Sequence, residues 1–161
     1  MSAEITEGRP VSYSRTEQVH ILTMDTINGY GRLFGGVLMQ WIDVVAAVVA
    51  RRHSGKNVTT ASVDNLQFAA AAHANDTVIL SGYLPYAGRT SMEVCVRSYV
   101  EELDGTRREI NTAHLILVAM DEDEKPTPVP PVIPETETEK REYEEAKKRR
   151  EYRELRKREN F

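Results

Sequence analysis

The 161-residue chain has little of several features that would place it in a class at once. It has a single cysteine, Cys95, so no disulfide can form within the chain, and a reducing compartment such as the cytoplasm is expected. No segment approaches the ~20 apolar residues that a membrane-spanning helix requires. We therefore do not expect contact with a membrane.

Targeting signals and excess positive charge are also missing. The first ten residues carry Glu4 and Glu7 and contain no apolar run, so we expect no signal peptide. The formal net charge is −4, which argues weakly against a nucleic-acid-binding surface. Together these features predict a cytoplasmic protein whose partners are neither nucleic acids nor membranes.

The histidines and glycines give no cofactor signal. The four histidines are scattered and lack metal-ligand spacing. They are His20, His53, His73 and His114. The glycines near position 35 are not followed by the Gly-Lys-Ser/Thr of a phosphate-binding loop. We therefore expect neither a metal nor another cofactor.

One long apolar segment stands out. From Gly36 to Ala50 only Gln40 and Asp43 are polar, and the run is long enough for about four helical turns. Basic residues then precede Gly55, which is typical of a helix C-terminus. A helix that is apolar on nearly every side belongs in a core. The sequence therefore predicts a central helix.

Shorter runs predict strands. Before the helix, Val19 to Met24 is one such run, and residues 25–36 form a loop rich in Gly and Asn. Four more runs follow the helix: Val58 to Phe68, Thr77 to Tyr86, Ser91 to Glu101 and Thr112 to Met120. We expect these four to form a meander, with hairpins at residues 87–89 and 103–105. This order predicts an α+β fold in which an antiparallel sheet wraps around the helix.

The composition changes after position 120. Residues 121–134 are rich in proline, and the Pro-Thr-Pro-Val-Pro-Pro segment within them (126–131) is expected to be extended and without a core. Residues 135–161 are dominated by charge, acidic first and basic last, which favours a helix. This helix is expected to be solvated and to pack on a neighbouring subunit, with phosphate contact through residues 147–150 as the alternative. The predicted boundaries are a tail (1–11), a domain (12–124), a Pro-rich linker (125–134) and a charged helix (135–161).

Asp43 is a carboxylate inside the apolar helix. The next turn of that helix carries Ala46 and Ala47, whose small side chains leave space for a substrate or another chain. Apolar surroundings favour the protonated form of a carboxylate, the usual preparation for acid–base catalysis. The alternative is a buried structural aspartate that is hydrogen-bonded to backbone or to a partner side chain.

Gly35 and Gly36 open the same helix. Glycines allow close approach of the backbone, and the free N–H groups of a first helical turn can bind a carbonyl oxygen. Such donors stabilise a developing oxyanion. The alternative is a tight loop-to-helix turn with no chemical role. Helix dipole, carbonyl pocket and the Asp43 carboxylate together describe an acyl-transfer site.

As an ordered set, several motifs resemble those of the hotdog-fold acyl-CoA thioesterases of the acyl-CoA hydrolase family, which includes brain-type and bacterial members. The resemblance covers residues 12–150. Its motifs are Asn28, Gly35-Gly36, Leu-Met-Gln-Trp-Ile-Asp at 38–43, Arg52-His53, Thr-Thr-Ala-Ser-Val-Asp at 59–64, Phe68 and Gly-Arg-Thr-Ser-Met-Glu-Val at 88–94.

The resemblance implies a hotdog fold, in which a five-stranded antiparallel sheet wraps around one long central helix, here followed by the charged C-terminal helix. It implies a homodimer whose two sheets join edge to edge, and commonly a trimer of such dimers. The implied reaction is hydrolysis of fatty acyl-CoA to a free fatty acid and CoA, without a cofactor.

The resemblance also implies a division of labour across the dimer. Asp43 of one subunit would act as general base or nucleophile, and Asn28 of the other would position the water or the carbonyl. The N–H groups at Gly35 and Gly36 would polarise the thioester oxygen. The implied CoA contacts are Thr60, Ala61, Ser62, Arg89, Thr90 and Ser91. A guanidinium beside hydroxyls also suits a nucleotide phosphate, which supports Arg89.

Two other functions compete with hydrolysis. A non-catalytic acyl-CoA sensor on the same scaffold would not need Asp43, and would usually bring a DNA-binding segment, which the sequence lacks. A hotdog dehydratase or hydratase would need a catalytic histidine near the helix, and His53 lies at the wrong end of it. Arg32 stands at a position where family members vary widely, and it lies close enough to the proposed site to alter access.

Overall fold

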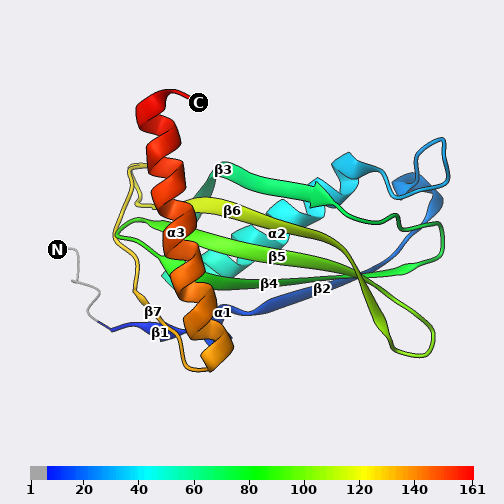
Figure 1. Cartoon of the computed structure of the whole chain (residues 1–161), viewed down its shortest axis with the longest axis horizontal. Coiled ribbons are helices and arrows are strands. Elements are labelled where there is room, and N and C mark those ends of the chain that lie inside the picture. The colour runs from blue at the N-terminus through cyan, green and yellow to red at the C-terminus, as the bar shows by residue number, and fades with distance from the viewer. Residues whose placement is uncertain (1–6) are drawn as a thin grey trace.

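A computed structural model describes residues 7–161 and contains one five-stranded antiparallel sheet with a long helix on each face (Figure 1). The strands lie in the order β2-β4-β5-β6-β3. Their bounds are β2 Thr16–Ile21, β3 Asn57–Phe68, β4 Thr77–Ala87, β5 Ser91–Glu101 and β6 Arg107–Met120. The shorter elements are β1 Arg9–Pro10, α1 Val11–Ser14, η1 Met24–Thr26 and β7 Val132–Ile133.

The helix α2 (Gly35–Ser54) packs against the inner face of the sheet. Its buried side chains recur at helical spacing and include Leu38, Ile42 and Val45, while Met92 and Val94 of β5 face them from the sheet. Gly55 adopts φ +66° at the C-terminal cap, a left-handed conformation that favours glycine. The prediction of a five-stranded antiparallel sheet around one long helix is confirmed.

The predicted four-strand meander is wrong for its first strand. β4, β5 and β6 follow one another in the sheet, but β3 pairs with β6 and lies at the far edge. Alternation identifies a strand and its buried face but not its neighbour, so the crossing of residues 69–76 was not visible in the sequence. The first strand also ends earlier than predicted, because Met24 begins the 3₁₀ turn η1.

The Pro-rich segment forms no helix, and it packs against the domain. Val129 and Val132 are each only 6% exposed and belong to the main core, so the expectation of a segment without a core is wrong. The carbonyl oxygen of Pro130 lies 2.7 Å from His53 Nε2, and β7 pairs in parallel with β1. A prolyl residue keeps its carbonyl acceptor, which allows such anchoring. Residues 1–6 of the predicted tail, and most of the segment expected to lack a signal peptide, lie outside the described residues.

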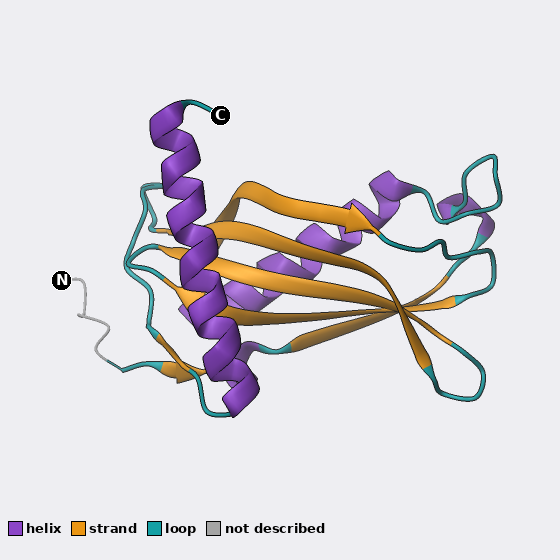
Figure 2. Cartoon of the chain, in the orientation of Figure 1, coloured by secondary structure: helices purple, strands orange, loops and turns teal. Residues whose placement is uncertain are grey.

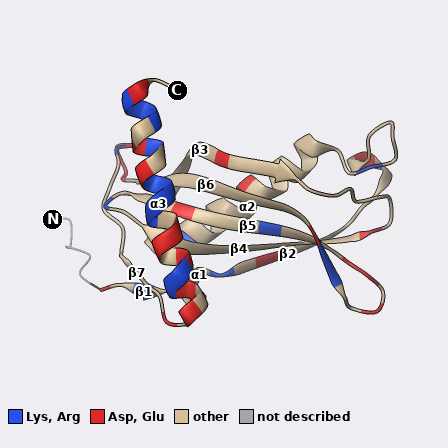
Figure 3. Ribbon diagram, viewed as in Figure 1, with Lys and Arg blue, Asp and Glu red and all other residues tan. Residues whose placement is uncertain are grey.

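The charged helix α3 (Glu137–Glu159) crosses the outer face of the sheet (Figure 2). It begins at Thr136 with a capping box completed by Glu139, and its surface alternates in charge (Figure 3). The helix rests on its own sheet, and its packing on a neighbouring subunit stays a prediction. In residues 7–161, no helix is both long and apolar enough to cross a membrane.

Candidate functional site

Asp43 lies on the side of α2 that the sheet leaves open. Its side chain is exposed in the protomer, and Thr60 Oγ1 of β3 donates a hydrogen bond of 2.7 Å to its Oδ1. The neighbouring Met39 and Val44 are each 46% exposed. The alternative of a buried structural aspartate is therefore wrong for the protomer. An apolar helix surface and an oriented carboxylate therefore face outward together.

The start of α2 carries no side-chain cap. Phe34 occupies the N-cap position, where a serine, threonine or aspartate side chain would normally accept a hydrogen bond. Val37 and Leu38 donate their N–H groups to the Phe34 carbonyl, at 3.0 and 3.2 Å. Within the described part of the chain, the N–H groups of Gly35 and Gly36 have no backbone acceptor. Two donors at the positive end of the helix are thus free to bind an oxygen.

Asn28 organises the loop that leads into α2. Its side-chain oxygen accepts the N–H groups of Tyr30 and Arg32, at 3.0 and 3.2 Å, and Gly31 turns the chain with φ +72°. The side-chain amide nitrogen has no partner among the described residues. The turn therefore fixes the Asn28 side chain and leaves its NH₂ group available as a donor to a ligand.

A cavity of about 380 Å³ lies beside this loop at the start of α2. It is lined by Asn28, Arg32, Leu33, Gly35, Leu38, Phe68, the alanines 69–72 and Ile110. Phe68 packs against Gly35, since a side-chain carbon built on that glycine would lie 3.5 Å from the phenyl ring. The cavity brings Asn28 and Gly35 together, but Asp43 does not line it. One protomer does not assemble the whole predicted catalytic set.

The predicted CoA contacts form two groups at the other end of the sheet. Thr60, Ala61 and Ser62 are exposed on the edge strand β3, with a register shift between Thr60 and Ser62. Ser91 pairs with Val118 of β6, which in turn pairs with β3 beside Thr60. The two groups thus lie at one level of the sheet, two strands apart.

The hairpin between β4 and β5 is firmly anchored. The carbonyl oxygens of Arg89 and Thr90 accept N–H groups of Val129 and Ala119, at 2.9 and 3.1 Å. The Arg89 side chain is exposed and has no partner among residues 7–161. A fixed backbone therefore presents a free guanidinium.

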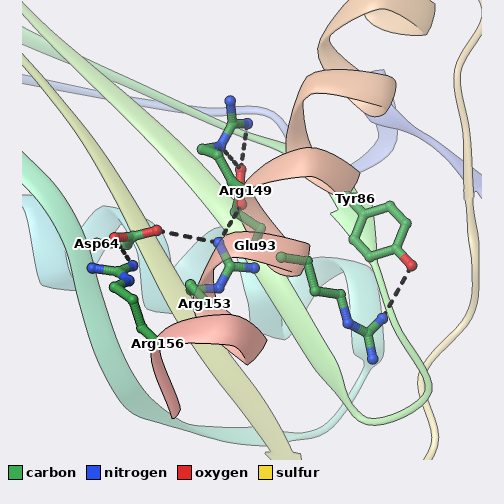
Figure 4. A network of polar contacts seen from close by, with 7 residues as sticks. Asp64, Tyr86, Glu93, Arg149, Arg153 and Arg156 are labelled. Atoms are coloured by element: carbon green, nitrogen blue, oxygen red, sulfur yellow. Dashed lines mark hydrogen bonds and ion pairs between the residues drawn. The ribbon is translucent and has the colours of Figure 1, made fainter. Parts of the chain in front are cut away.

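A network of ion pairs under α3 was missed by the sequence reasoning (Figure 4). The Glu93 side chain is 1% exposed, and it accepts hydrogen bonds from Arg149 at 2.6 Å and Arg153 at 3.0 Å. Asp64 of β3 accepts from Arg153 at 3.3 Å and Arg156 at 2.8 Å. The spacing of the three arginines puts them on one face of a helix, which was the available signal.

Burial and the arginine charges act on the pKa in opposite directions at Asp64 and in the same direction at His114. Burial alone would raise the pKa of Asp64, but hydrogen bonds from Arg156 and Arg153 outweigh it and leave that pKa below its usual value. The pKa of His114, on the neighbouring strand, is lowered by burial and then by the positive charge of Arg149. The carboxylate stays ionised and the imidazole stays neutral at neutral pH, as expected for a structural network.

His53 has a structural place as well. It is 1% exposed at the C-terminal end of α2, and burial lowers its pKa despite the hydrogen bond to Pro130. The free N–H groups lie at the opposite end of this helix. The position of His53 therefore gives no support to dehydratase chemistry.

The sequence of the chain matches a known family. The family model described as Thioesterase superfamily matches residues 30–105. The chain is 40% identical over 134 residues to the uncharacterized acyl-CoA thioester hydrolase YkhA of Bacillus subtilis, an alignment that covers 83% of this chain and 74% of that protein. The chain therefore belongs to the acyl-CoA thioester hydrolases of this hotdog-fold superfamily, which confirms the predicted family.

Longer relatives are similar over part of their length. The cytosolic acyl coenzyme A thioester hydrolase of Rattus norvegicus is 34% identical over 146 residues, but the chain spans only 38% of that protein.

Solved structures extend the similarity to nearly the whole chain. An apo-hexameric acyl-CoA thioesterase superimposes with a TM-score of 0.90 at 42% identity, covering 93% of this chain and 97% of that one. The acyl-CoA hydrolase of Staphylococcus aureus, solved with butyryl coenzyme A, coenzyme A and coenzyme A disulfide, gives a TM-score of 0.90 at 33% identity, covering 94% and 93%. Variants of that hydrolase with alanine in place of its Asp43, Asn28 or Thr60 have also been solved.

Proposed function

We propose that this chain hydrolyses acyl-CoA thioesters at sites formed between two copies of itself. Water adds its oxygen to the acyl carbon, the carbon–sulfur bond breaks, and the products are a free carboxylic acid and the CoA thiol. The observation that carries this proposal is the exposed Asp43 carboxylate, which Thr60 orients at 2.7 Å on the uncovered stripe of α2. Membership of the acyl-CoA thioester hydrolases supplies the substrate class.

Asp43 drives the reaction by one of two routes. As a general base it takes a proton from the attacking water, and as a nucleophile it forms a mixed anhydride that water then opens. Because Thr60 holds Oδ1, the second carboxylate oxygen is free to face the water or the acyl carbon. Because water attacks the acyl carbon in both routes, mass spectrometry of a rapidly quenched single turnover separates them, since only the nucleophilic route attaches the acyl group covalently to the Asp43 side chain.

The thioester oxygen binds at the start of α2. The free N–H groups of Gly35 and Gly36 stabilise the oxyanion, typically worth about 10²–10³ in rate for each donor. Asn28 donates its side-chain NH₂ group to the carbonyl or the water, and it comes from the second copy together with Gly35, which lines the same cavity. A partner is needed because, within one chain, Asn28 lines a cavity that Asp43 does not reach.

The second copy pairs along the edge strand β3. Val63 shares a sheet row with the buried Leu115 and Val94, yet it is 47% exposed. Together with Met39 and Val44 it forms an apolar strip beside an unpaired strand edge, which is the surface a partner sheet would cover. The hexameric relative supports a further association of three such dimers.

CoA binds at the opposite end of the sheet from Gly35. Thr60, Ala61 and Ser62 contact its pantetheine arm from the β3 edge. Thr90 and Ser91 provide polar contacts at the hairpin, and the free guanidinium of Arg89 pairs with a phosphate. We also propose a cytoplasmic location, which is supported by the free thiol of Cys95 and by the name of the rat relative.

A complementation experiment tests both the reaction and the shared site. Asp43→Asn and Asn28→Ala should each be inactive in a CoA-thiol release assay. In a C₂ dimer of the two variants, one site combines an intact Asp43 with an intact Asn28, so random mixing should recover about a quarter of wild-type activity. No recovery, despite subunit exchange, would sink the shared site. Tight acyl-CoA binding by the wild type without thiol release would favour a sensor over an enzyme.

A further inference from the structure

The cavity at the start of α2 is lined by one arginine, Arg32, that has no role in the proposed reaction. Arg32 lines it beside Asn28 and Gly35, and its guanidinium has no hydrogen bond or ion pair within residues 7–161. Most of the remaining wall is apolar and includes Leu33 and Leu38. Arg32 is exposed to solvent in the protomer, so an anionic group of a ligand in the adjoining apolar cavity can take the place of water at its guanidinium.

The neighbouring arginine is already engaged. Arg108 donates to the carbonyl oxygen of Ala71 at 3.2 Å, and its Nε lies 3.8 Å from Glu102. Arg32 differs because only its backbone forms hydrogen bonds. Its N–H donates to Asn28 Oδ1 at 3.2 Å, and its carbonyl oxygen accepts from the N–H of Asn28 at 2.8 Å. The backbone of Arg32 is therefore held in place, while its guanidinium group is free to bind a ligand.

The geometry excludes the phosphates of the bound CoA as the anion that Arg32 would bind. The pantetheine arm separates the thioester from the nucleotide phosphates, and Arg32 shares its cavity with Gly35, at the thioester end. Arg89 occupies the hairpin at the opposite end of the sheet. The anion that reaches Arg32 must therefore belong to the acyl group itself.

We propose that Arg32 determines substrate specificity and selects short acyl groups that end in a carboxylate, such as glutaryl or adipyl. The inference rests on the proposed hydrolysis of acyl-CoA. A guanidinium binds a carboxylate through two parallel hydrogen bonds, while the apolar wall receives the methylene groups. The cavity, at about 380 Å³, is near the lower end of the ~300–1,000 Å³ typical of ligand pockets, which favours a short chain.

The test compares chains of equal length with and without the terminal charge. We expect the wild type to show a higher kcat/KM for adipyl-CoA than for hexanoyl-CoA, and for glutaryl-CoA than for pentanoyl-CoA. Arg32→Gln should lower the charged-to-neutral ratio about fivefold to tenfold, mainly through KM, because a partly solvated charge pair is lost. Arg32→Lys should keep part of the preference, and Arg32→Glu should reverse it.

Arg51→Gln is the matched control. Arg51 is exposed at the other end of α2, and its side chain has no partner within the described residues, so this change should leave the ratio unaltered. An unchanged ratio in Arg32→Gln, or a wild type that prefers the neutral chains, overturns the assignment of Arg32 and leaves the hydrolase intact. If none of the four substrates releases the CoA thiol, the proposed function is overturned instead.

Discussion

The two long helices pack on opposite faces of one sheet by different physical means. α2 has 20 residues and buries eight of them, whereas α3 has 23 residues and buries only Ala146. Apolar burial holds α2, because each side chain removed from water contributes free energy in proportion to its area. Ion pairs between arginines and the buried Glu93 and partly buried Asp64 hold α3.

This difference separates the tasks of the two faces. Apolar packing is non-directional, so α2 can leave one stripe uncovered and use it for Asp43 without losing its attachment. A buried charge must be paired, so Glu93 commits Arg149 and Arg153 to structure. The phosphate role considered for residues 147–150 is accordingly closed to Arg149, and Arg150 is hydrogen-bonded to Tyr86 at 3.0 Å.

The largest expected effect is on activity and concerns the open stripe of α2. Asp43→Asn should lower kcat about 10²–10⁴-fold, the usual contribution of a positioned acid or base. Its melting temperature should stay near that of the wild type, because the exposed carboxamide can still accept the Thr60 hydrogen bond. Thiol-release kinetics and calorimetry check this prediction. Wild-type turnover in Asp43→Asn would remove the catalytic role from this face.

The next effect concerns the packed side of the same helix. Ile42 is 1% exposed, and Ile42→Ala should reduce the free energy of unfolding by about 2–5 kcal/mol through lost burial and a residual cavity. Denaturant unfolding measures the loss. Val44→Ala, at a position that is 46% exposed in the protomer, is the matched control and should cost much less under monomeric conditions. Equal losses would mean that α2 is not held by its buried side.

A smaller loss of stability is expected beneath α3. Glu93→Gln keeps the shape but removes the charge that Arg149 and Arg153 share, and should cost about 1–3 kcal/mol. The cost stays below that of a fully buried pair because the two arginine side chains are 28% and 14% exposed. Denaturant unfolding measures the loss of stability. The thiol-release rate of the folded variant should stay near that of the wild type, which would show that Glu93 contributes to stability and not to catalysis.

Glu109→Gln provides the surface control for this measurement. Glu109 lies 3.6 Å from Arg97, but both side chains are more than a third exposed, so its loss should change stability by no more than about 0.5 kcal/mol. If the two substitutions cost the same, the burial of Glu93 does not set the strength of the network.

The sequence predicted the central helix α2 more completely than the contacts that hold β3 and α3, and the reason is physical. The period of apolar residues located α2, and Gly55 located its end, because burial and backbone conformation leave local signals. Other features depend on residues that lie far apart in the chain. They are the pairing of β3 with β6, the exposure of Asp43 and the packing of α3 on the sheet. Asp64 and Arg156, for example, are 92 positions apart. Such contacts are decided by topology, which a local pattern does not contain.

The smallest expected effect is the pH dependence of the α3 attachment. The pKa of Asp64 lies below its usual value of about 3.9 when the protein is folded, so the unfolded chain binds the proton more readily. The stabilisation from Asp64 is therefore complete above about pH 5 and is lost as the pH falls through the folded-state pKa. We expect less than about 1 kcal/mol, because Arg156 is 53% exposed and water screens the pair.

Comparison with Asp64→Asn isolates this contribution from the other carboxylates. The difference in unfolding free energy between the wild type and Asp64→Asn should be largest near pH 6 and should shrink steadily below pH 4. High salt should reduce the difference at pH 6, whereas it should leave the cost of Ile42→Ala on α2 almost unchanged. A difference that grows on acidification would show that arginine pairing does not stabilise the ionised Asp64, and the contrast between the two helices would then rest on Glu93 alone.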